Sequence, residues 1–196
     1  MQTDLIQAAD AGDLDAVRRL LADGAAVDAQ DARGRTALLA ATQGNHIAVA
    51  AALIAAGADV NEQDHGLDSA FLYAGAAGFV EVLRLAAKTA DTTVTNRYGG
   101  TALIPACERG HVETVEFLVT ETGTDVNHVN NLGWTALLEA IILSDGGARH
   151  QRIVELLIRH GADVQLADRN GVTPLAHAKS RGYDVIGEML EAAGGP

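Results

Sequence analysis

Three residues that lie close together in this sequence, Cys107, Glu108 and His111, have side chains that could support catalysis. A cysteine thiolate activated by a nearby base is a nucleophile, and a carboxylate or an imidazole can transfer a proton. That reactivity needs a stabilised thiolate, which a buried cysteine does not provide. Cys107 follows Ala106 in a short apolar segment, at a position where a small buried residue is expected. We therefore interpret Cys107 as a packing residue.

Histidine is the other candidate for catalysis or metal binding, and the sequence contains seven. His46, His111 and His150 occupy the same position of a repeated pattern, the turn between two predicted helices. Equivalent residues of neighbouring repeats are separated by about 8–10 Å, the spacing of packed helices. Zinc, in contrast, needs several ligand atoms about 2 Å from one centre. The sequence also has no phosphate-binding glycine loop and no cysteine pair with metal-ligand spacing, so we expect no catalytic residue, metal or cofactor.

The elements that position these residues share a phrase of five residues. It occurs as Gly34–Leu38, Gly99–Leu103, Gly133–Leu137 and Gly171–Leu175, with a weaker copy at Leu67–Phe71. The Thr or Ser residues of successive copies are 33, 32, 34 and 38 residues apart. A period of this length indicates an array of stacked structural repeats.

Each copy predicts a hairpin tip, a first helix, a short turn, a second helix and a return loop. In the second repeat, Thr36 is expected to cap the first helix by accepting a hydrogen bond from a free N–H of its first turn. Leu38 and Ala41 lie three residues apart, so both can point inward from one face of that helix. Gly57 is expected to end the second helix in the left-handed conformation.

The Gly-x-Thr-Pro/Ala-Leu phrase and its period resemble those of ankyrin-repeat proteins over essentially the whole chain. This resemblance implies an all-α solenoid of about six helix-turn-helix units with short hairpin-like tips. The units are expected near residues 1–31, 32–64, 65–97, 98–131, 132–169 and 170–196. We expect residues 1–196 to form a single ankyrin-repeat domain, in which repeats near 1–31 and 170–196 cap the ends of the core. The resemblance further implies that the histidines at the turns are structural.

Three repeats depart from the pattern. Repeat 3 has Leu67 where the glycine of the tip belongs. Repeat 4 has Pro105 in its first helix, where it is the fourth helical residue if Thr101 is the cap, near enough to the helix start to cost little. Repeat 5 has five extra residues, Ser144–Ala148, between its two helices. Such an insertion either joins a binding face or is a longer loop without a role, and the sequence leaves both open.

The resemblance implies that the tips and the exposed sides of the first helices bind a partner. We predict partner-binding residues in repeats 3 to 5, namely Tyr73, Tyr98, Arg109, Leu132, Trp134, Glu139 and Ile142. Trp134 is the only tryptophan and occupies a variable position of its tip, and aromatic residues and arginine dominate the energetics of interfaces. The alternative is that Trp134 folds down onto its neighbouring tip.

Composition limits the partners and the compartment. A formal net charge of −12 makes nucleic acid and anionic membranes poor partners, although it also serves simply to keep an alanine-rich protein in solution. A lone cysteine allows no intramolecular disulfide, which is typical of a reducing compartment. No signal peptide or membrane span is visible. These features predict a cytoplasmic monomer.

We therefore predict a protein–protein interaction module and not an enzyme. Recognition would use a rigid surface, because tips held by the stacked repeats lose little entropy on binding. Two alternatives remain. An inhibitor or adaptor dedicated to one enzyme would form a tight stoichiometric complex, whereas a groove-type receptor for a small ligand or peptide would show a thermal shift with its metabolite.

Overall fold

The computed structural model describes residues 2–194, and these residues form two compact units. Unit 1 holds residues 2–75 and 79–97, and unit 2 holds residues 76–78 and 98–194. The described residues contain twelve α-helices and no strand, so the prediction of an all-α fold made of helix pairs is confirmed.

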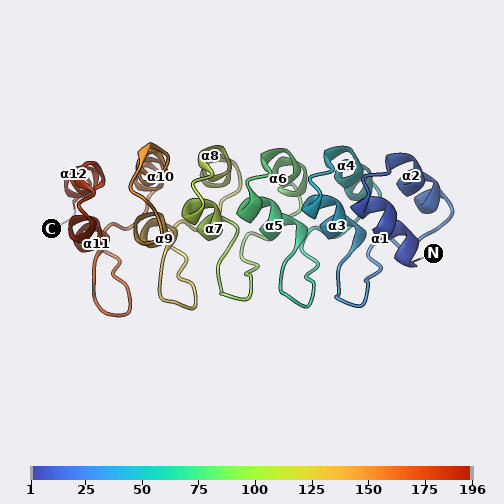
Figure 1. Ribbon diagram of the computed structural model, residues 1–196, viewed down its shortest axis with the longest axis horizontal. Coiled ribbons are helices and arrows are strands. Elements are labelled where there is room, and N and C mark those ends of the chain that lie inside the picture. The colour runs from blue at the N-terminus through green and yellow to red at the C-terminus, as the bar shows by residue number, and fades with distance from the viewer. Residues whose placement is uncertain (1, 195–196) are drawn as a thin grey trace. The chain divides into compact units, whose positions relative to one another are not determined.

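Unit 1 contains three helix pairs. Its helices are α1 (Gln2–Asp10), α2 (Leu14–Ala22), α3 (Ala37–Gln43), α4 (Ile47–Ala55), α5 (Ala70–Ala77) and α6 (Val80–Ala86). The last two residues of α5, 76 and 77, belong to unit 2. Helix α1 packs against α3, and α4 packs against both α2 and α6, so first helices and second helices form separate rows (Figure 1).

Unit 2 contains the other three pairs. Its helices are α7 (Leu103–Glu108), α8 (Val112–Glu121), α9 (Ala136–Ile142), α10 (Ala148–Arg159), α11 (Pro174–Arg181) and α12 (Asp184–Ala192). Helices α7, α9 and α11 pack side by side, and α8, α10 and α12 form the second row. The loops that precede α9 and α11 extend beyond the first helices, on the side opposite to the second row (Figure 1).

Helix capping follows the repeated phrase. Thr36 Oγ1 accepts a hydrogen bond from the Leu39 N–H at 3.2 Å, and Thr135 Oγ1 accepts one from the Leu138 N–H at 3.2 Å. Equivalent bonds are made in repeats 3 and 6 by Ser69 and Thr173. A hydroxyl at this position satisfies an N–H that the helix itself leaves free. The predicted cap at Thr36 is confirmed, and Ser69, Thr135 and Thr173 make the same bond.

The exception is repeat 4, where the expected cap is wrong. Helix α7 begins at Leu103, and the buried hydroxyl of Thr101 has no hydrogen-bond partner within residues 2–194. In the other four copies the N–H four residues after the cap bonds to the carbonyl of the cap, but Pro105 has no N–H. Instead, the Ile104 N–H donates a hydrogen bond to the Thr101 carbonyl at 3.3 Å, and it therefore does not donate to the Thr101 hydroxyl. Pro105 is thus the third residue of α7, not the fourth.

Leu67 occupies its tip in the conformation that glycine adopts elsewhere. Its φ is 60°, close to the φ of 78° at Gly34 and 83° at Gly133. A residue with a Cβ atom is strained in this region, so the tip of repeat 3 keeps its shape at some cost in stability.

The insertion in repeat 5 is partly helical. Ala148, predicted to lie in the loop, is the first residue of α10, which has 12 residues. The Tyr183 hydroxyl donates a hydrogen bond to the Ser144 carbonyl at 2.6 Å, and Gln151 Nε2 donates one to the Gly146 carbonyl at 2.8 Å. The remaining loop is therefore held against the turn of repeat 6. A role of this loop in binding stays a prediction.

The lengths of the helices show whether any of them could span a membrane. With α10 the longest at 12 residues, no helix within residues 2–194 has both the length and the apolar character needed to cross a bilayer.

Candidate functional site

One asparagine fixes the tip of repeat 5. The Asn130 N–H donates to the Trp134 carbonyl at 3.0 Å, which closes the loop. Asn130 Oδ1 accepts hydrogen bonds from the N–H groups of Leu132 at 2.9 Å and Trp134 at 3.0 Å. Asn130 itself is only 5% exposed. Buried side-chain bonds of this kind hold the tip backbone in one conformation.

The tips of repeats 4 and 5 are joined directly. The Asn131 N–H donates to the Tyr98 carbonyl at 2.9 Å, and His128 Nε2 lies 2.7 Å from the Gly99 carbonyl oxygen. Tyr98 is 56% exposed and Leu132 is 51% exposed, at equivalent positions of the two tips. We call Tyr98, Leu132 and the half-buried Trp134 the tip surface.

Glu139, on α9, is buried. The expectation that Glu139 is presented on the exposed side of a first helix is therefore wrong, because only 5% of the residue is accessible. Asn130 Nδ2 donates a hydrogen bond to Glu139 Oε1 at 2.6 Å. The same asparagine thus holds both the tip backbone and this carboxyl group.

The electrostatic environment of Glu139 is unfavourable to its charged form. Burial, above all, raises the pKa of Glu139 to about 7, and the charge of Glu108 on α7 adds to this effect. The hydrogen bond from Asn130 acts in the opposite direction. Within residues 2–194, neither Glu108 nor Glu139 forms an ion pair with a basic side chain. Buried charges are normally paired, so this carboxyl group is unusual.

Repeat 6 shows how the same two positions can be paired. There the residue at the start of the tip is Asp168 and the residue on α11 is His177, and Asp168 Oδ2 lies 2.9 Å from His177 Nε2. The Val172 N–H, above all, lowers the pKa of the Asp168 carboxyl, and the histidine ring adds to this. In repeat 5 the two equivalent residues are Asn130, whose side chain is a neutral amide, and Glu139, which is an acid.

The residues that could have formed a nucleophilic site are not arranged as one. Cys107 is fully buried, and burial together with the charge of Glu139 raises the pKa of its thiol well above the usual range. A raised pKa keeps the thiol protonated and a poor nucleophile. The His111 ring is hydrogen-bonded to the Ala76 backbone, and burial lowers the pKa of that ring.

His46 and His150 have structural partners in the preceding repeat. The prediction that His150 lies in the turn between two helices is wrong, because the helix starts earlier than expected and His150 is the third residue of α10. His46 Nε2 lies 3.0 Å from the Asp10 carbonyl oxygen, and His150 Nε2 lies 3.0 Å from the Glu108 carbonyl oxygen. His150 Nδ1 faces Asp145 Oδ1 at 3.4 Å without forming a hydrogen bond. Among the residues that the structure describes, no three His, Cys, Asp or Glu side chains are grouped so that they could hold a metal ion.

The other predicted binding residues occupy different environments. Tyr73 belongs to unit 1, where its ring packs at 6.4 Å from that of Phe79. Arg109 is exposed, and its Nη1 donates to the Ala76 carbonyl at 2.7 Å. Ile142 is half-buried at the end of α9, and its carbonyl accepts a hydrogen bond from Arg181 Nη2 at 3.4 Å. The structure therefore places Tyr98, Leu132 and Trp134 on two hydrogen-bonded tips, Glu139 buried on α9, and Tyr73 in the other unit.

Asn130 and its role as an organiser of the site were not identified from the sequence. A signal was available, because the residue five positions before each cap is always Asp or Asn. These residues are Asp31, Asp64, Asn96, Asn130 and Asp168.

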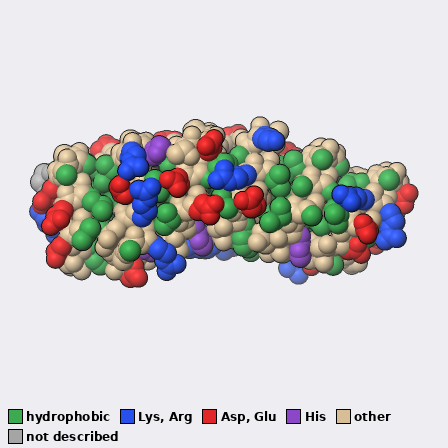
Figure 2. Space-filling view, turned by 90° about the horizontal axis from the view of Figure 1, so that it is seen from above, with side chains coloured by type: hydrophobic (Ala, Val, Ile, Leu, Met, Phe, Trp, Pro, Cys, Tyr) green, Lys and Arg blue, Asp and Glu red, His purple; other side chains and the backbone are tan. Residues whose placement is uncertain are grey.

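Several charged residues on the second-helix row of unit 2 form ion pairs. Arg152 lies 3.3 Å from Glu116 and 2.7 Å from Glu155, and Arg159 lies 2.6 Å from Glu155. Acidic and basic side chains lie next to one another on this face in Figure 2. Exposed pairs of this kind contribute little stability.

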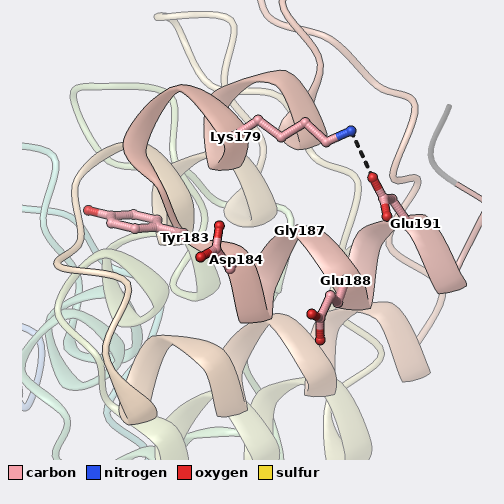
Figure 3. A pocket seen from close by; sticks show the side chains of 6 residues that line it. All are labelled: Lys179, Tyr183, Asp184, Gly187, Glu188 and Glu191. Atoms are coloured by element: carbon pink, nitrogen blue, oxygen red, sulfur yellow. Dashed lines mark ion pairs between the residues drawn. The ribbon is translucent and has the colours of Figure 1, made fainter.

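A pocket of about 240 Å³ lies on the last repeat (Figure 3). It is lined by Lys179, Tyr183, Asp184, Gly187, Glu188 and Glu191. Lys179 Nζ pairs with Glu191 Oε1 at 2.7 Å, while the Tyr183 ring points away toward the Ser144 carbonyl. Binding sites for small molecules are mostly apolar, and this lining is largely charged, so the pocket does not favour a small-ligand receptor.

Comparison with known proteins agrees with this geometry. The sequence matches the ankyrin repeats family in three copies, over residues 2–64, 70–168 and 122–194, of which the last two overlap. It is 43% identical to the ankyrin repeat protein YahD of Escherichia coli (strain K12), over 99% of this chain and 97% of that protein.

Two crystal structures show the same fold. An ankyrin repeat domain from Acinetobacter baumannii AYE superimposes with a TM-score of 0.95 at 53% identity, covering 98% of both chains. The ankyrin repeat domain of Bcl-3, a member of the IkappaB protein family, superimposes with a TM-score of 0.88 at 27% identity. It covers 98% of this chain and 86% of that chain.

Proposed function

Because this chain belongs to the ankyrin-repeat family, we propose that it binds a protein partner through the tips and first helices of unit 2. Ankyrin repeats are generally protein–protein interaction modules and generally have no catalytic activity. The observation that carries the proposal is the tip surface, where Tyr98 and Leu132 expose more than half of their area on tips that are hydrogen-bonded to each other.

The chemical character of the tip surface fits protein recognition. Exposed aromatic and large aliphatic side chains are the usual anchors of interfaces, and Trp134 lies on the same tip as Leu132. Arg109 and Ile142 lie on the first helices of the same unit and extend the proposed contact area. Tyr73, on α5, is proposed as a further contact if both units meet one partner.

Preorganisation of the tips supports tight binding. Asn130 holds the backbone of repeat 5, and the Asn131–Tyr98 bond connects it to repeat 4. A surface that is ordered before the partner arrives loses little conformational entropy on association. The proposal therefore includes an interface that changes little in shape between the free and the bound protein.

The proposal also covers partner class, oligomeric state and location. A net charge of −12 supports a protein partner over nucleic acid or an anionic membrane. We propose a cytoplasmic monomer, consistent with a single cysteine that is buried. Residues 1–196 are proposed to act as one ankyrin-repeat domain.

Affinity capture with matched baits tests the proposal. The native chain, the double variant Tyr98→Ala/Trp134→Ala, and the control Ile47→Ala/Val185→Ala would be compared after circular dichroism confirms equal helicity. Ile47 and Val185 are also exposed large hydrophobics but lie outside the tips. We expect one protein to be retained by the native chain and the control and lost by the tip variant.

The interaction would then be measured with the purified partner, using the fluorescence of Trp134, the only tryptophan. A loss of affinity of about 100-fold in the tip variant is expected if both residues are anchors. Equal affinity of the tip variant and the native chain would show that the binding surface lies elsewhere.

A further inference from the structure

Leu67, in unit 1, is an exposed apolar residue held in an unfavourable backbone conformation. Its φ is 60°, and 45% of the residue is accessible to solvent. The equivalent residue of the other four tips is a glycine with positive φ, namely Gly34, Gly99, Gly133 and Gly171. Glycine adopts this conformation without strain, whereas leucine does not. Backbone strain persists mainly at functional sites, so it points to a contact that leucine makes and glycine cannot.

The tips of repeats 2 and 3 are joined to each other around Leu67. The His65 N–H donates to the Arg33 carbonyl at 2.9 Å, and the Leu67 N–H donates to the Asp64 carbonyl at 2.9 Å, which closes the turn. His65 Cδ2 lies 2.9 Å from the position that a Cβ atom on Gly34 would occupy, so the ring packs on the tip of repeat 2. These tips belong to the loops that precede α3 and α5 (Figure 1). We call Arg33, His65 and Leu67 the repeat 2–3 surface.

Arg33 and His65 give the repeat 2–3 surface a basic character. Both residues are exposed, and neither side chain forms a hydrogen bond or an ion pair within residues 2–194. Arg35, two positions after Arg33, is instead paired with Asp31 and Asp10. A guanidinium group without an acid partner is notable in a chain with 26 acidic and only 14 Lys and Arg residues.

The acids of these two tips are already engaged. Asp31 Oδ1 accepts hydrogen bonds from the N–H groups of Arg33 at 2.8 Å and Arg35 at 3.0 Å, and Asp31 Oδ2 accepts one from Arg35 Nε at 3.0 Å. Asp64 binds the backbone of its own tip in the same way. Asp68 is half-buried and also has an interaction partner. The Arg33 guanidinium is therefore left to attract an anion from outside the chain.

The occupant of this surface has to combine an anion with an apolar side chain. A carboxylate matches the guanidinium of Arg33, because the two planar groups can form paired hydrogen bonds. Leu67 offers only an apolar contact, which a free anion does not use. Neighbouring repeats are about 8–10 Å apart, and an extended chain advances about 3.3 Å per residue. A protein segment therefore spans both tips when its acid lies two or three positions from an apolar residue.

We infer that the repeat 2–3 surface binds an extended protein segment in which Glu or Asp lies two or three positions from a large apolar residue. The carboxylate bonds to Arg33, and the apolar side chain packs on Leu67. The strained leucine is then retained for affinity at the expense of stability. This inference goes beyond the proposed function, because the surface belongs to unit 1 and the tip surface belongs to unit 2.

Nuclear magnetic resonance with two peptides tests the inference. The probe is the N-acetylated heptapeptide amide Leu-Gly-Gly-Glu-Gly-Gly-Leu, which offers the acid and the apolar residue in both chain directions. Its analogue has Gln in place of Glu. At pH 7 in 0.15 M NaCl, which screens the net charge of the chain, the glutamate peptide is expected to shift the Arg33 Nε–H and Leu67 N–H resonances. Its dissociation constant should be at least about threefold lower than that of the glutamine peptide.

Leu67→Gly gives the decisive result, because stability and binding should change in opposite directions. Relief of strain is expected to raise Tm by about 2–4 °C. The dissociation constant of the glutamate peptide should increase by at least about threefold, since the apolar contact is lost. The control Ile47→Ala removes an exposed apolar side chain on α4 and should leave this constant unchanged.

Two further variants with equal changes of charge test the ion pair. Arg33→Gln should abolish the difference between the peptides, whereas Arg18→Gln, at an exposed position of α2, should retain it. Equal dissociation constants on the native chain, a preference that survives Arg33→Gln, or no shift at tens of millimolar peptide would each overturn the inference. Unchanged binding or a lower Tm in Leu67→Gly would do the same.

The outcome is independent of the affinity capture that tests unit 2. The Tyr98→Ala/Trp134→Ala variant should retain the preference for the glutamate peptide, because both substitutions lie outside unit 1. Loss of the preference in that variant would place the peptide site in unit 2 and overturn the inference.

Discussion

Helices α7 and α9 begin with the same three residue types but reach different structures. Thr101-Ala102-Leu103 and Thr135-Ala136-Leu137 are both copies of the capping phrase. Thr135 caps its helix, whereas the Thr101 hydroxyl is buried without a partner. The two helices differ at the fourth position after the cap, which is Pro105 in α7 and Glu139 in α9.

This difference shows that the repeated phrase does not by itself decide how a repeat starts. Pro105 removes the N–H that the other first helices use, and the cap is lost. Glu139 keeps the N–H and the cap but places an acid in a buried site. The fourth position is thus where neighbouring repeats acquire different stabilities and different chemistry.

The largest expected effect comes from removing the side chain that organises the α9 site. Asn130→Ala deletes two bonds to the tip backbone and the single bond to Glu139. We expect the free energy of unfolding in urea to fall by about 4 kcal/mol, because buried groups lose their partners. Asn170→Ala, an exposed residue of the next tip, is the control and should stay within about 0.5 kcal/mol of the native chain. Similar losses in both variants would contradict the role given to Asn130.

A pH-dependent stability difference tests the buried acid. The pKa of Glu139 is about 7 in the folded protein and 4.5 is its ordinary value, so folding is penalised as the pH rises through this window. The penalty is absent below about pH 4.5 and complete above about pH 7, where it amounts to about 3 kcal/mol. Glu139→Gln should therefore stabilise the protein by about that amount at pH 8 and leave it unchanged near pH 4.

The matching control is Glu108→Gln, which removes the neighbouring charge and should lower the pKa of Glu139. Urea denaturation of the three proteins at both pH values provides the measurement. A stabilisation by Glu139→Gln that is the same at both pH values would show that the charge of Glu139 is not its cause.

Replacing each cap by an isosteric residue compares α7 and α9 directly. Thr135→Val removes the bond to the Leu138 N–H and should lower the free energy of unfolding by about 1.5 kcal/mol. Thr101→Val removes a hydroxyl that has no partner and should raise it by about 1 kcal/mol. We expect the two substitutions to change the free energy of unfolding, measured by thermal or urea denaturation, in opposite directions. Equal losses in both variants would show that Thr101 does cap α7 in solution.

The smallest expected effect is a coupling between Pro105 and Thr101. Pro105→Ala supplies an N–H that can bond to the Thr101 carbonyl, which frees the Ile104 N–H for the hydroxyl. Thr101→Val should then become destabilising in the Pro105→Ala background, with a coupling of about 1 kcal/mol in a double-mutant cycle. Additive effects of the two substitutions would mean that the proline is not the reason for the missing cap.

Prediction from sequence succeeded where the interaction is local. The cap at Thr36, the left-handed turn at Gly57 and the buried position of Cys107 are all confirmed. Each depends on residues within a few positions or on the regular spacing of a helix, so a pattern is enough to identify it. The failure at Thr101 is also local, because Pro105 was recognised but its effect on the cap bond was not.

Prediction failed for Glu139 because exposure is set by residues far apart in the sequence. Its position on a first helix was correct, but Asn130 on the tip and Glu108 on the preceding helix determine its burial and its pKa. Asp168 and His177 occupy the same pair of positions one repeat later and form an ion pair. Whether the repeats present Tyr98, Leu132 and Trp134 to one partner stays a prediction.

The sequence by itself determined the all-α repeat architecture, the family and most helix starts, because the repeated phrase and its period encode local geometry that recurs every 32 to 38 residues. Only the tertiary structure decided that one acid, Glu139, is buried and has a neutral amide but no ion-pair partner among residues 2–194. Burial and charge pairing depend on distances through space between neighbouring repeats, and residues such as Glu108 and Glu139, 31 positions apart, meet only when the helices are packed.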